Sequence, residues 1–198
     1  SMRPHPTAEE VQTLYGSVWS KLADRSMATA EDLPPMTDPH KLAAMRLLAE
    51  TWPPAYFTDF NLTVLVICHL VDLSIEHGAT DTSNQGFALM GWLAGPVLNL
   101  YEDGYRLVAG AARLVENAHG SLDRGRTFDT AGQAAAWTRP LSESLAWSRK
   151  AYQAGNEAGD VYFSCYSAFH TSVQLLMRGH DLREDAAECE GYLRAARE

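Results

Sequence analysis

The stretch Ala158-Gly159-Asp160-Val161 combines the end of one helix with the start of the next. Glycine adopts the left-handed backbone conformation that ends many helices, and an aspartate side chain accepts hydrogen bonds from the free N–H groups of a first helical turn. We therefore predict one helix from Pro140 to Gly159 and another over residues 161–177. Because so few residues join them, the two helices should pack as an antiparallel pair.

The same pattern recurs along the chain. Glycines that end predicted helices stand at Gly78, Gly120 and Gly159, roughly 40 residues apart, and Gly179 marks half a period. Each period holds two helices of roughly 15–20 residues, which is typical of an α-solenoid. Strand signals are nearly absent. The sequence predicts an all-α fold, an irregular tetratricopeptide-like array of antiparallel helix pairs with about seven to nine helices, and a compact helical bundle is the alternative.

The other helices are predicted from their caps and breakers. Asp38-Pro39 should start a helix that Trp52-Pro53-Pro54 ends, because proline removes a helical hydrogen bond and clashes with the preceding turn. Glycines inside predicted helices, such as Gly91, are poor helix formers and indicate that neighbouring backbones approach closely. Further helices are expected over residues 56–77, 84–99, 103–119, from about 127, and 182–197.

Composition excludes several classes of partner. The chain has 198 residues, of which 46% are hydrophobic, and a formal net charge of -9. This content supports a sizeable core without disulfides or metals. The acidity argues against a nucleic-acid partner and against adhesion to anionic membranes, since both favour clustered Lys and Arg.

Cysteine usage and hydropathy indicate a cytoplasmic protein without membrane insertion. Cys68, Cys165 and Cys189 form no CxxC pair, and the first two lie in apolar runs where we expect them to be buried. Such usage fits a reducing compartment. The longest apolar stretch, Leu62 to Leu73, is interrupted by polar residues and is too short to span a bilayer, and residues 1–30 lack the apolar segment of a signal peptide.

Two regions are predicted. Residues 1–37 form a separate, weakly attached element, with one amphipathic helix over residues 8–22 and a polar connector over 26–37. Residues 38–198 form the helical-repeat domain. Ser1 before Met2 resembles the remnant of a cloning tag, and the helical pattern that runs to Glu198 suggests a piece of a longer protein.

Motifs of enzyme chemistry are weak in this sequence. It contains no GxxxxGK[ST], no GxGxxG that opens a helix and no GxSxG, so phosphate-loop and esterase chemistry lack support. His69, Asp72 and Glu76 share one helix face and offer metal ligands, although such polar faces more often contact solvent or another helix. Cys165 and His170 lie about 140° apart around a helix, which does not suit a nucleophile and its base.

His180-Asp181 is the dipeptide found in metal-dependent phosphohydrolases of the HD type, and His119, His170 and Asp185 are the further ligands such an enzyme would need. Gly179 and Asp181 are equally explained as the end of one helix and the N-cap of the next. We therefore expect no catalytic residue, no cofactor and no metal in this chain. The HD-type enzyme remains an alternative function.

Aromatic side chains are numerous for a helical array, and most should pack between helices. The alternative is a groove that offers aromatic anchors to a peptide or a neighbouring domain, or an aromatic-lined pocket for a small ligand in a sensor domain. Arginines such as Arg149 would bind carboxylates of a partner in such a groove. The candidate interaction residues are Tyr105, Trp137, Tyr162, Tyr192 and Leu193.

The last helix, over residues 182–197, mixes an apolar stripe with many charges. We expect the helix before it to cover only half of that stripe, which predicts weak self-association.

Several short motifs resemble a helical region of large bacterial signalling proteins. That family combines a serine/threonine-kinase-like domain, an AAA-type ATPase module, a tetratricopeptide-like region, a GAF domain and a histidine kinase. The resemblance covers roughly residues 38–198 and rests on order and spacing. The motifs are Pro53-Pro54-Ala55-Tyr56, Leu73-Ser74-Ile75-Glu76-His77-Gly78, Ser83-Asn84-Gln85-Gly86-Phe87, Gly91, Tyr101-Glu102-Asp103-Gly104-Tyr105, Ala111 and Ala158-Gly159-Asp160-Val161-Tyr162.

The resemblance implies a non-catalytic scaffold or sensor domain for signal transduction. Its partners would be the neighbouring ATPase and kinase modules of the same polypeptide, or another protein. It implies no catalytic residue within this segment, and residues 1–37 match nothing in that family.

Overall fold

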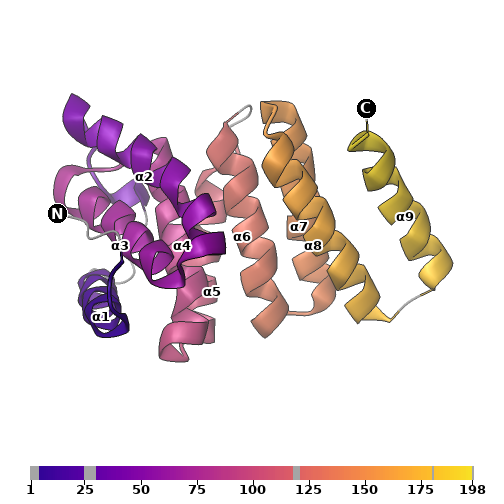
Figure 1. The fold of residues 1–198 in the computed structure, drawn as a ribbon, viewed down its shortest axis with the longest axis horizontal. Coiled ribbons are helices and arrows are strands. Elements are labelled where there is room, and N and C mark those ends of the chain that lie inside the picture. The colour runs from indigo at the N-terminus through magenta and orange to yellow at the C-terminus, as the bar shows by residue number, and fades with distance from the viewer. Residues whose placement is uncertain (1–4, 25–29, 118–120, 180, 198) are drawn as a thin grey trace. The chain divides into compact units, whose positions relative to one another are not determined.

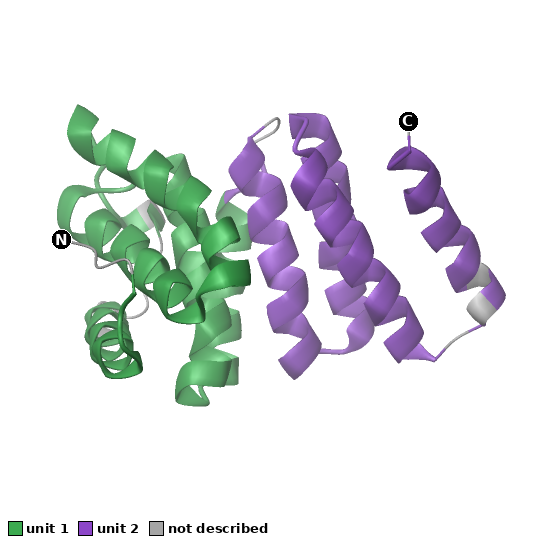
Figure 2. Cartoon of the chain, in the orientation of Figure 1, with its two compact units in different colours: residues 1–114 green, residues 115–198 purple. Residues whose placement is uncertain are grey.

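The computed structural model describes residues 5–24, 30–117, 121–179 and 181–197 (Figure 1). In these ranges the chain is all-α, as predicted, and its only β pairing is an isolated bridge between Pro35 and Ala79. It divides into two compact units, residues 1–114 and residues 115–198 (Figure 2). The helices of the first are α1 Ala8–Asp24, α2 Pro39–Thr58, α3 Phe60–His77, α4 Asp81–Leu98 and α5 Tyr101–Leu114. Those of the second are α6 Leu122–Thr138, α7 Leu141–Ala158, α8 Val161–Arg178 and α9 Leu182–Ala195.

Helix α3 forms the centre of the first unit and packs against α1, α2 and α4. By length and composition alone, among the described helices only α3 is long and apolar enough to cross a membrane. One side of α3 nevertheless belongs to a protein core, since Val66, Ile67 and Leu70 are fully buried. Core helices of this kind satisfy the same criteria as membrane spans.

Helix α1 is integrated into the first unit, whereas the sequence predicted a weakly attached element. Tyr15 is fully buried and donates a hydrogen bond from its hydroxyl to the carbonyl oxygen of Met90 at 2.7 Å. Lys21 forms ion pairs with Asp72 and Glu76 of α3. The amphipathic stripe of α1 therefore contributes to the same core as α3 and α4.

The connector after α1 is also attached to this unit. It contains a short 3-10 helix, η1 Ala30–Asp32. The N–H of Met36 donates to the carbonyl of Ala79 at 2.9 Å, and the N–H of Ala79 donates to Pro34 at 2.7 Å. Gly78, with a φ of 101°, allows this approach, because a Cβ there would collide with the Pro34 carbonyl. Two backbone hydrogen bonds thus fix the connector beside the start of α4.

The prediction that Pro53 and Pro54 end α2 was wrong, because the helix continues to Thr58. Trp52 and Ala55 are both buried on either side of the prolines, so packing on the core offsets the lost helical hydrogen bonds. The helix ends at Asp59, whose side chain accepts a hydrogen bond from Leu62 N–H and starts α3.

Other helix ends differ from prediction by a few residues. Helix α4 begins at Asp81, and Thr80 and Ser83 form a reciprocal capping box. Helix α6 begins at Leu122, about five residues before the expected position. Helix α5 ends at Leu114, earlier than expected, and Gly120 lies outside the described residues.

Close backbone approach explains some of the glycines inside helices, as predicted, whereas a Cβ added to Gly16 of α1 would meet nothing within 4 Å. Gly91 of α4 and Gly104 of α5 face each other, and a Cβ added to either would collide with the carbonyl oxygen of the other. In the second unit, a Cβ on Gly125 of α6 would lie 3.0 Å from the nitrogen of Gly155 of α7. These contacts set how tightly consecutive helices pack.

Candidate functional site

The stretch between α7 and α8 has the predicted geometry. Gly159 is left-handed with a φ of 72°, and Asp160 accepts a hydrogen bond from Phe163 N–H at 3.2 Å. The same carboxylate accepts a second bond from Arg126 Nε of α6 at 2.9 Å. The guanidinium of Arg126 also stacks over the Phe163 ring at 4.9 Å. Helix α6 therefore fixes the first turn of α8.

A second polar contact joins the middle of α8 to α6. The Nδ1 atom of His170 lies 3.0 Å from an oxygen of Asp129, and Gln133 donates to the other oxygen of that carboxylate at 2.9 Å. Asp129 is almost fully buried and His170 is mostly buried. Two buried carboxylates on the α6–α8 side thus hold α8 in one orientation.

The opposite side of α8 is apolar and exposed. Residues 162, 165, 169, 173 and 176 repeat at helical spacing and lie on one face. Phe169 is 58% exposed and Leu176 is 68% exposed. We define the α8 apolar face by Tyr162, Cys165, Phe169, Val173, Leu176 and Met177.

Aromatic rings along this face support one another. Tyr166 stacks on Tyr162 with ring centroids 6.1 Å apart and on Phe169 at 6.3 Å, and it meets His170 edge to face at 4.3 Å. Because Asp129 fixes His170, the ring of Tyr166 has a rigid neighbour. Rigid aromatic side chains lose little conformational entropy when a partner covers them.

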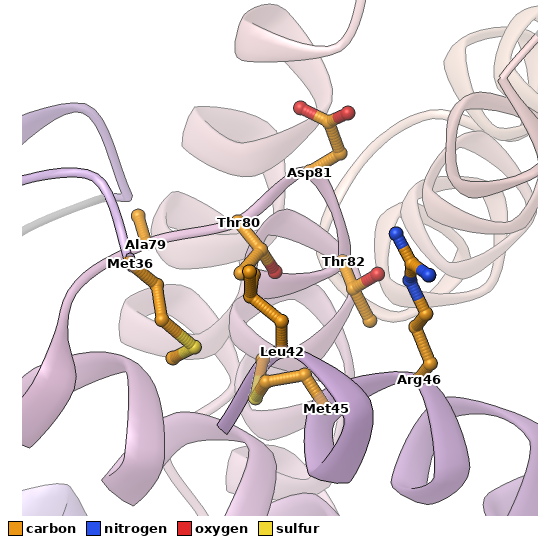
Figure 3. A pocket seen from close by; sticks show the side chains of 8 residues that line it. All are labelled: Met36, Leu42, Met45, Arg46, Ala79, Thr80, Asp81 and Thr82. Carbon is orange, nitrogen blue, oxygen red and sulfur yellow. The ribbon is translucent and has the colours of Figure 1, made fainter. Parts of the chain in front are cut away.

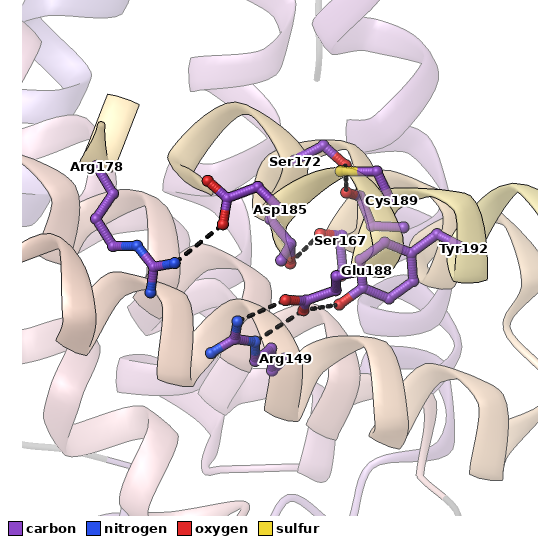
Figure 4. Close-up of polar contacts among 10 residues, drawn as sticks. Arg149, Ser167, Ser172, Arg178, Asp185, Glu188, Cys189 and Tyr192 are labelled. Carbon is purple, nitrogen blue, oxygen red and sulfur yellow. Dashed lines mark hydrogen bonds and ion pairs between the residues drawn. The ribbon is translucent and has the colours of Figure 1, made fainter. Parts of the chain in front are cut away.

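Helix α9 covers a different part of the second unit through polar contacts (Figure 4). Arg149 of α7 binds Glu188 with two parallel hydrogen bonds of 2.8 and 2.6 Å. Tyr192 donates to the same carboxylate at 2.7 Å, and its ring meets Tyr152 at 4.7 Å. The hydrogen bonds that Glu188 accepts, mainly from Arg149 and also from Tyr192, hold its pKa below the ordinary value. Arg178 of α8 donates to Asp185 at 3.0 Å.

The five candidate interaction residues lie in different environments. Tyr105 is only 7% exposed, Trp137, Tyr162 and Leu193 are exposed, and Tyr192 is half-buried against α7. Tyr162 alone among the five belongs to the α8 apolar face. Of the arginines expected to bind a partner's carboxylates, Arg149 pairs with Glu188 and Arg106 pairs with Asp103, both within the chain.

Sequence reasoning missed most of the α8 apolar face. Cys165 was expected to be buried, and this was wrong because it points to the exposed side of α8; Cys68 is buried, as predicted. The available signal was the near absence of charge: residues 161–178 contain a single Asp, Glu, Lys or Arg, which is Arg178. A helix that is apolar on both sides needs a second covering surface.

The residues considered for metal or catalytic roles are engaged elsewhere or lie outside the described chain. Asp72 and Glu76 bind Lys21, and burial lowers the pKa of the neighbouring His69. No group of three potential metal ligands occurs among the described residues. His119 and His180 are outside the described residues, so the HD-type prediction stays untested by the geometry.

The first unit contains a small surface pocket of about 270 Å³ (Figure 3). Arg46 of α2 and Asp81 at the start of α4 supply its charged groups. The remaining lining residues are Met36, Leu42, Met45, Ala79, Thr80 and Thr82. This mixture of apolar and polar groups suits a small polar molecule better than an extended partner.

Comparisons with protein-family models, with curated proteins and with solved structures gave no significant match.

Proposed function

We propose that this chain is a non-catalytic protein-binding domain that docks a partner through the α8 apolar face. The observation that carries this proposal is the continuous exposed stripe of large apolar side chains on a helix whose other side is fixed by Arg126–Asp160 and Asp129–His170. Contiguous exposed apolar patches mark interaction sites on monomeric proteins. Removing side chains such as Phe169 and Leu176 from water would stabilise a complex by about 1.5–3 kcal/mol each.

The partner should present an apolar surface with few charges. Tyr162 and Phe169 supply aromatic anchors of the type that dominate binding energy, and only His170 and Arg178 supply potentially charged groups along α8. An amphipathic helix laid along α8 fits this spacing, since its own apolar side chains repeat at the same interval.

We further propose that the helices form an irregular tetratricopeptide-like array. Sequential contacts of α6 with α7 and α7 with α8, together with the next-but-one contact of α6 with α8, support this arrangement for the second unit. In such an array one helix of each pair lines a common surface. The resemblance to bacterial signalling proteins adds the proposals of a cytoplasmic location and of ATPase or kinase modules as partners.

The test selects peptides from a random displayed library on the intact chain and maps them by hydrogen exchange. We expect protection of α8, and we expect Phe169→Asp with Leu176→Asp to weaken binding about tenfold or more. The matched control is Leu47→Asp on α2, because Leu47 is 70% exposed and belongs to the first unit. Peptides that leave α8 unprotected, or that bind the double variant unchanged, would overturn the proposal.

The pocket in Figure 3 favours a second candidate, a small-ligand sensor. A ligand that binds only the folded state raises the melting temperature. Thermal-shift screening of small polar molecules should then find compounds whose shift disappears in Arg46→Ala. The same preparations serve to measure bound metal and phosphoester hydrolysis, and turnover that His180→Ala abolishes would favour the HD-type enzyme instead.

A further inference from the structure

Helix α9 is attached to the second unit in an unusual way, because its inward side is polar. Among its described side chains only Asp185 is buried, and Glu188, Cys189 and Tyr192 are half-buried beside it. Leu193 faces solvent at the adjacent position. For the side chains of α9 that the structure describes, directed polar contacts rather than a shared apolar core therefore hold the helix in place.

The surface beneath α9 has the chemistry of a recognition site for an acidic helix (Figure 4). We define the α9 seat by Arg149 and Tyr152 of α7 and Ser172 and Arg178 of α8. Arg149 binds Glu188 in a bidentate pair, and Arg178 binds Asp185. Two arginines thus select two carboxylates three residues apart on one helix face.

A third contact adds direction to this recognition. Tyr192 lies four residues after Glu188, so it falls on the same helix face. Its hydroxyl donates to the Glu188 carboxylate at 2.7 Å while its ring meets Tyr152. The seat therefore fits a helix with Asp, Glu and Tyr at relative positions 0, 3 and 7.

The fit of α9 to this seat is incomplete. The Nε atom of Arg178 in the seat and the second carboxylate oxygen of Asp185 in α9 are buried and lack a hydrogen-bond partner among the described residues. Asp185 is more than nine-tenths buried. A buried polar group without a partner costs free energy, so a helix that satisfied the Nε atom of Arg178 and carried no unpartnered buried oxygen of its own would compete with α9.

We propose that the α9 seat is a docking surface for an acidic, tyrosine-bearing helix of a partner protein, and that α9 is its built-in competitor. The occupant follows from charge complementarity between Arg149 and Arg178 and the carboxylates of the incoming helix. This surface is separate from the α8 apolar face, and the proposal does not depend on the function proposed for that face. Binding of the partner helix releases α9 and exposes Cys189.

Cys189 offers a direct reporter in the intact chain. Its sulfur lies 3.2 Å from Ser172 Oγ and is half-buried, whereas Cys68 is fully buried. In a Cys165→Ser chain, Cys189 is then the thiol whose labelling rate reports whether α9 is docked or released. Glu188→Gln should increase its labelling rate roughly tenfold while the remaining helicity is kept. Loss of the helicity of the whole second unit in this variant would show α9 to be structural and would overturn the proposal.

A fluorescent peptide of residues 181–197 with Cys189→Ser tests binding in trans. We expect it to bind the Glu188→Gln chain at least tenfold more tightly than the wild-type chain, whose own α9 is present at a high effective concentration. Adding Arg149→Ala to the Glu188→Gln chain should abolish binding, as should Glu188→Gln in the peptide. Failure to bind the Glu188→Gln chain, or unchanged binding after Arg149→Ala, would overturn the proposal.

Two further readouts identify the occupant. A peptide that keeps only the residues equivalent to Asp185, Glu188 and Tyr192 on an alanine- and glutamine-rich helix should still bind, which extends recognition to helices of other proteins. Light scattering measures whether the wild-type chain dimerises, and thiol labelling measures whether Cys189 is protected. We expect no dimer in which Cys189 is protected from labelling. Such a dimer would assign the seat to α9 of a second copy and would overturn the choice of a partner protein.

Discussion

Arg126 and Asp160 form a buried ion pair in which Nε of the arginine lies 2.9 Å from a carboxylate oxygen and both side chains are 8% exposed. The aspartate is at the same time the N-cap of α8, since its other oxygen accepts a hydrogen bond from Phe163 N–H. One carboxylate thereby connects the start of α8 to the side of α6. The orientation of the α8 apolar face depends on this connection.

Arg126→Ala should destabilise the second unit by about 3–5 kcal/mol, because it leaves a buried carboxylate without its cation. Urea unfolding followed by circular dichroism measures this change. The control is Arg106→Ala, which removes an exposed i,i+3 pair with Asp103 and should cost no more than about 0.5 kcal/mol. Equal effects of the two variants would contradict the role assigned to the buried pair.

Tyr15→Ala tests whether α1 belongs to the core of the first unit. Deleting a fully buried aromatic side chain should cost about 3–5 kcal/mol, and Tyr15→Phe, which removes only the bond to Met90, should cost about 0.5–1.5 kcal/mol. Chemical unfolding of the intact chain gives both values. A Tyr15→Ala chain as stable as wild type would support the weakly attached element that the sequence predicted.

Local rules predicted those parts of the fold that depend on a few neighbouring residues. Gly159 and Asp160 end and start helices as expected, because left-handed glycine and aspartate capping need no distant partner. The same local rules were wrong at Pro53 and Pro54, since burial of Trp52 and Ala55 outweighs the hydrogen bonds that the prolines remove from the helix. Whether α2 continues past the prolines depends on tertiary packing, which a local sequence motif does not show.

The candidate site was predicted less well than the fold. Tyr162 was selected, but Phe169, Leu176 and Cys165 were not, because an apolar helix can be covered on both sides and the sequence does not say which side stays open. The pairing of Arg149 with Glu188 joins residues 39 positions apart. Such a contact depends on how α7 and α9 meet, which neither helix encodes alone.

Stability should fall as the pH rises above about 9, and Cys68 should account for part of this fall. Burial, helped by the negative charge of Asp72, raises the pKa of Cys68 from 9.0 to about 12. Between these two values the Cys68 thiol has lost its proton in the unfolded chain but keeps it in the folded chain. The free energy of unfolding therefore falls by about 1.4 kcal/mol for each pH unit above about 9. Burial raises the pKa of Tyr15 in the same sense.

The measurement is the urea midpoint of wild type and Cys68→Ala between pH 8.5 and 10.5. The variant should be less stable at pH 7, because it removes buried volume, yet its stability should fall less steeply with rising pH. Parallel curves for the two chains would contradict the assignment to Cys68.

Gly91→Ala should destabilise the first unit by about 1–3 kcal/mol, although alanine is the better helix former. The added methyl group would meet the Gly104 carbonyl and the side chains of Leu107 and Val108, so α4 and α5 must separate. Gly16→Ala in α1 is the matched control, because nothing lies within 4 Å of the added Cβ. There the helix-propensity gain should stabilise the chain by about 0.5–1 kcal/mol. Thermal unfolding of both variants should therefore shift in opposite directions, and a shift of Gly91→Ala to higher temperature would show that α4 and α5 do not require glycine at their contact.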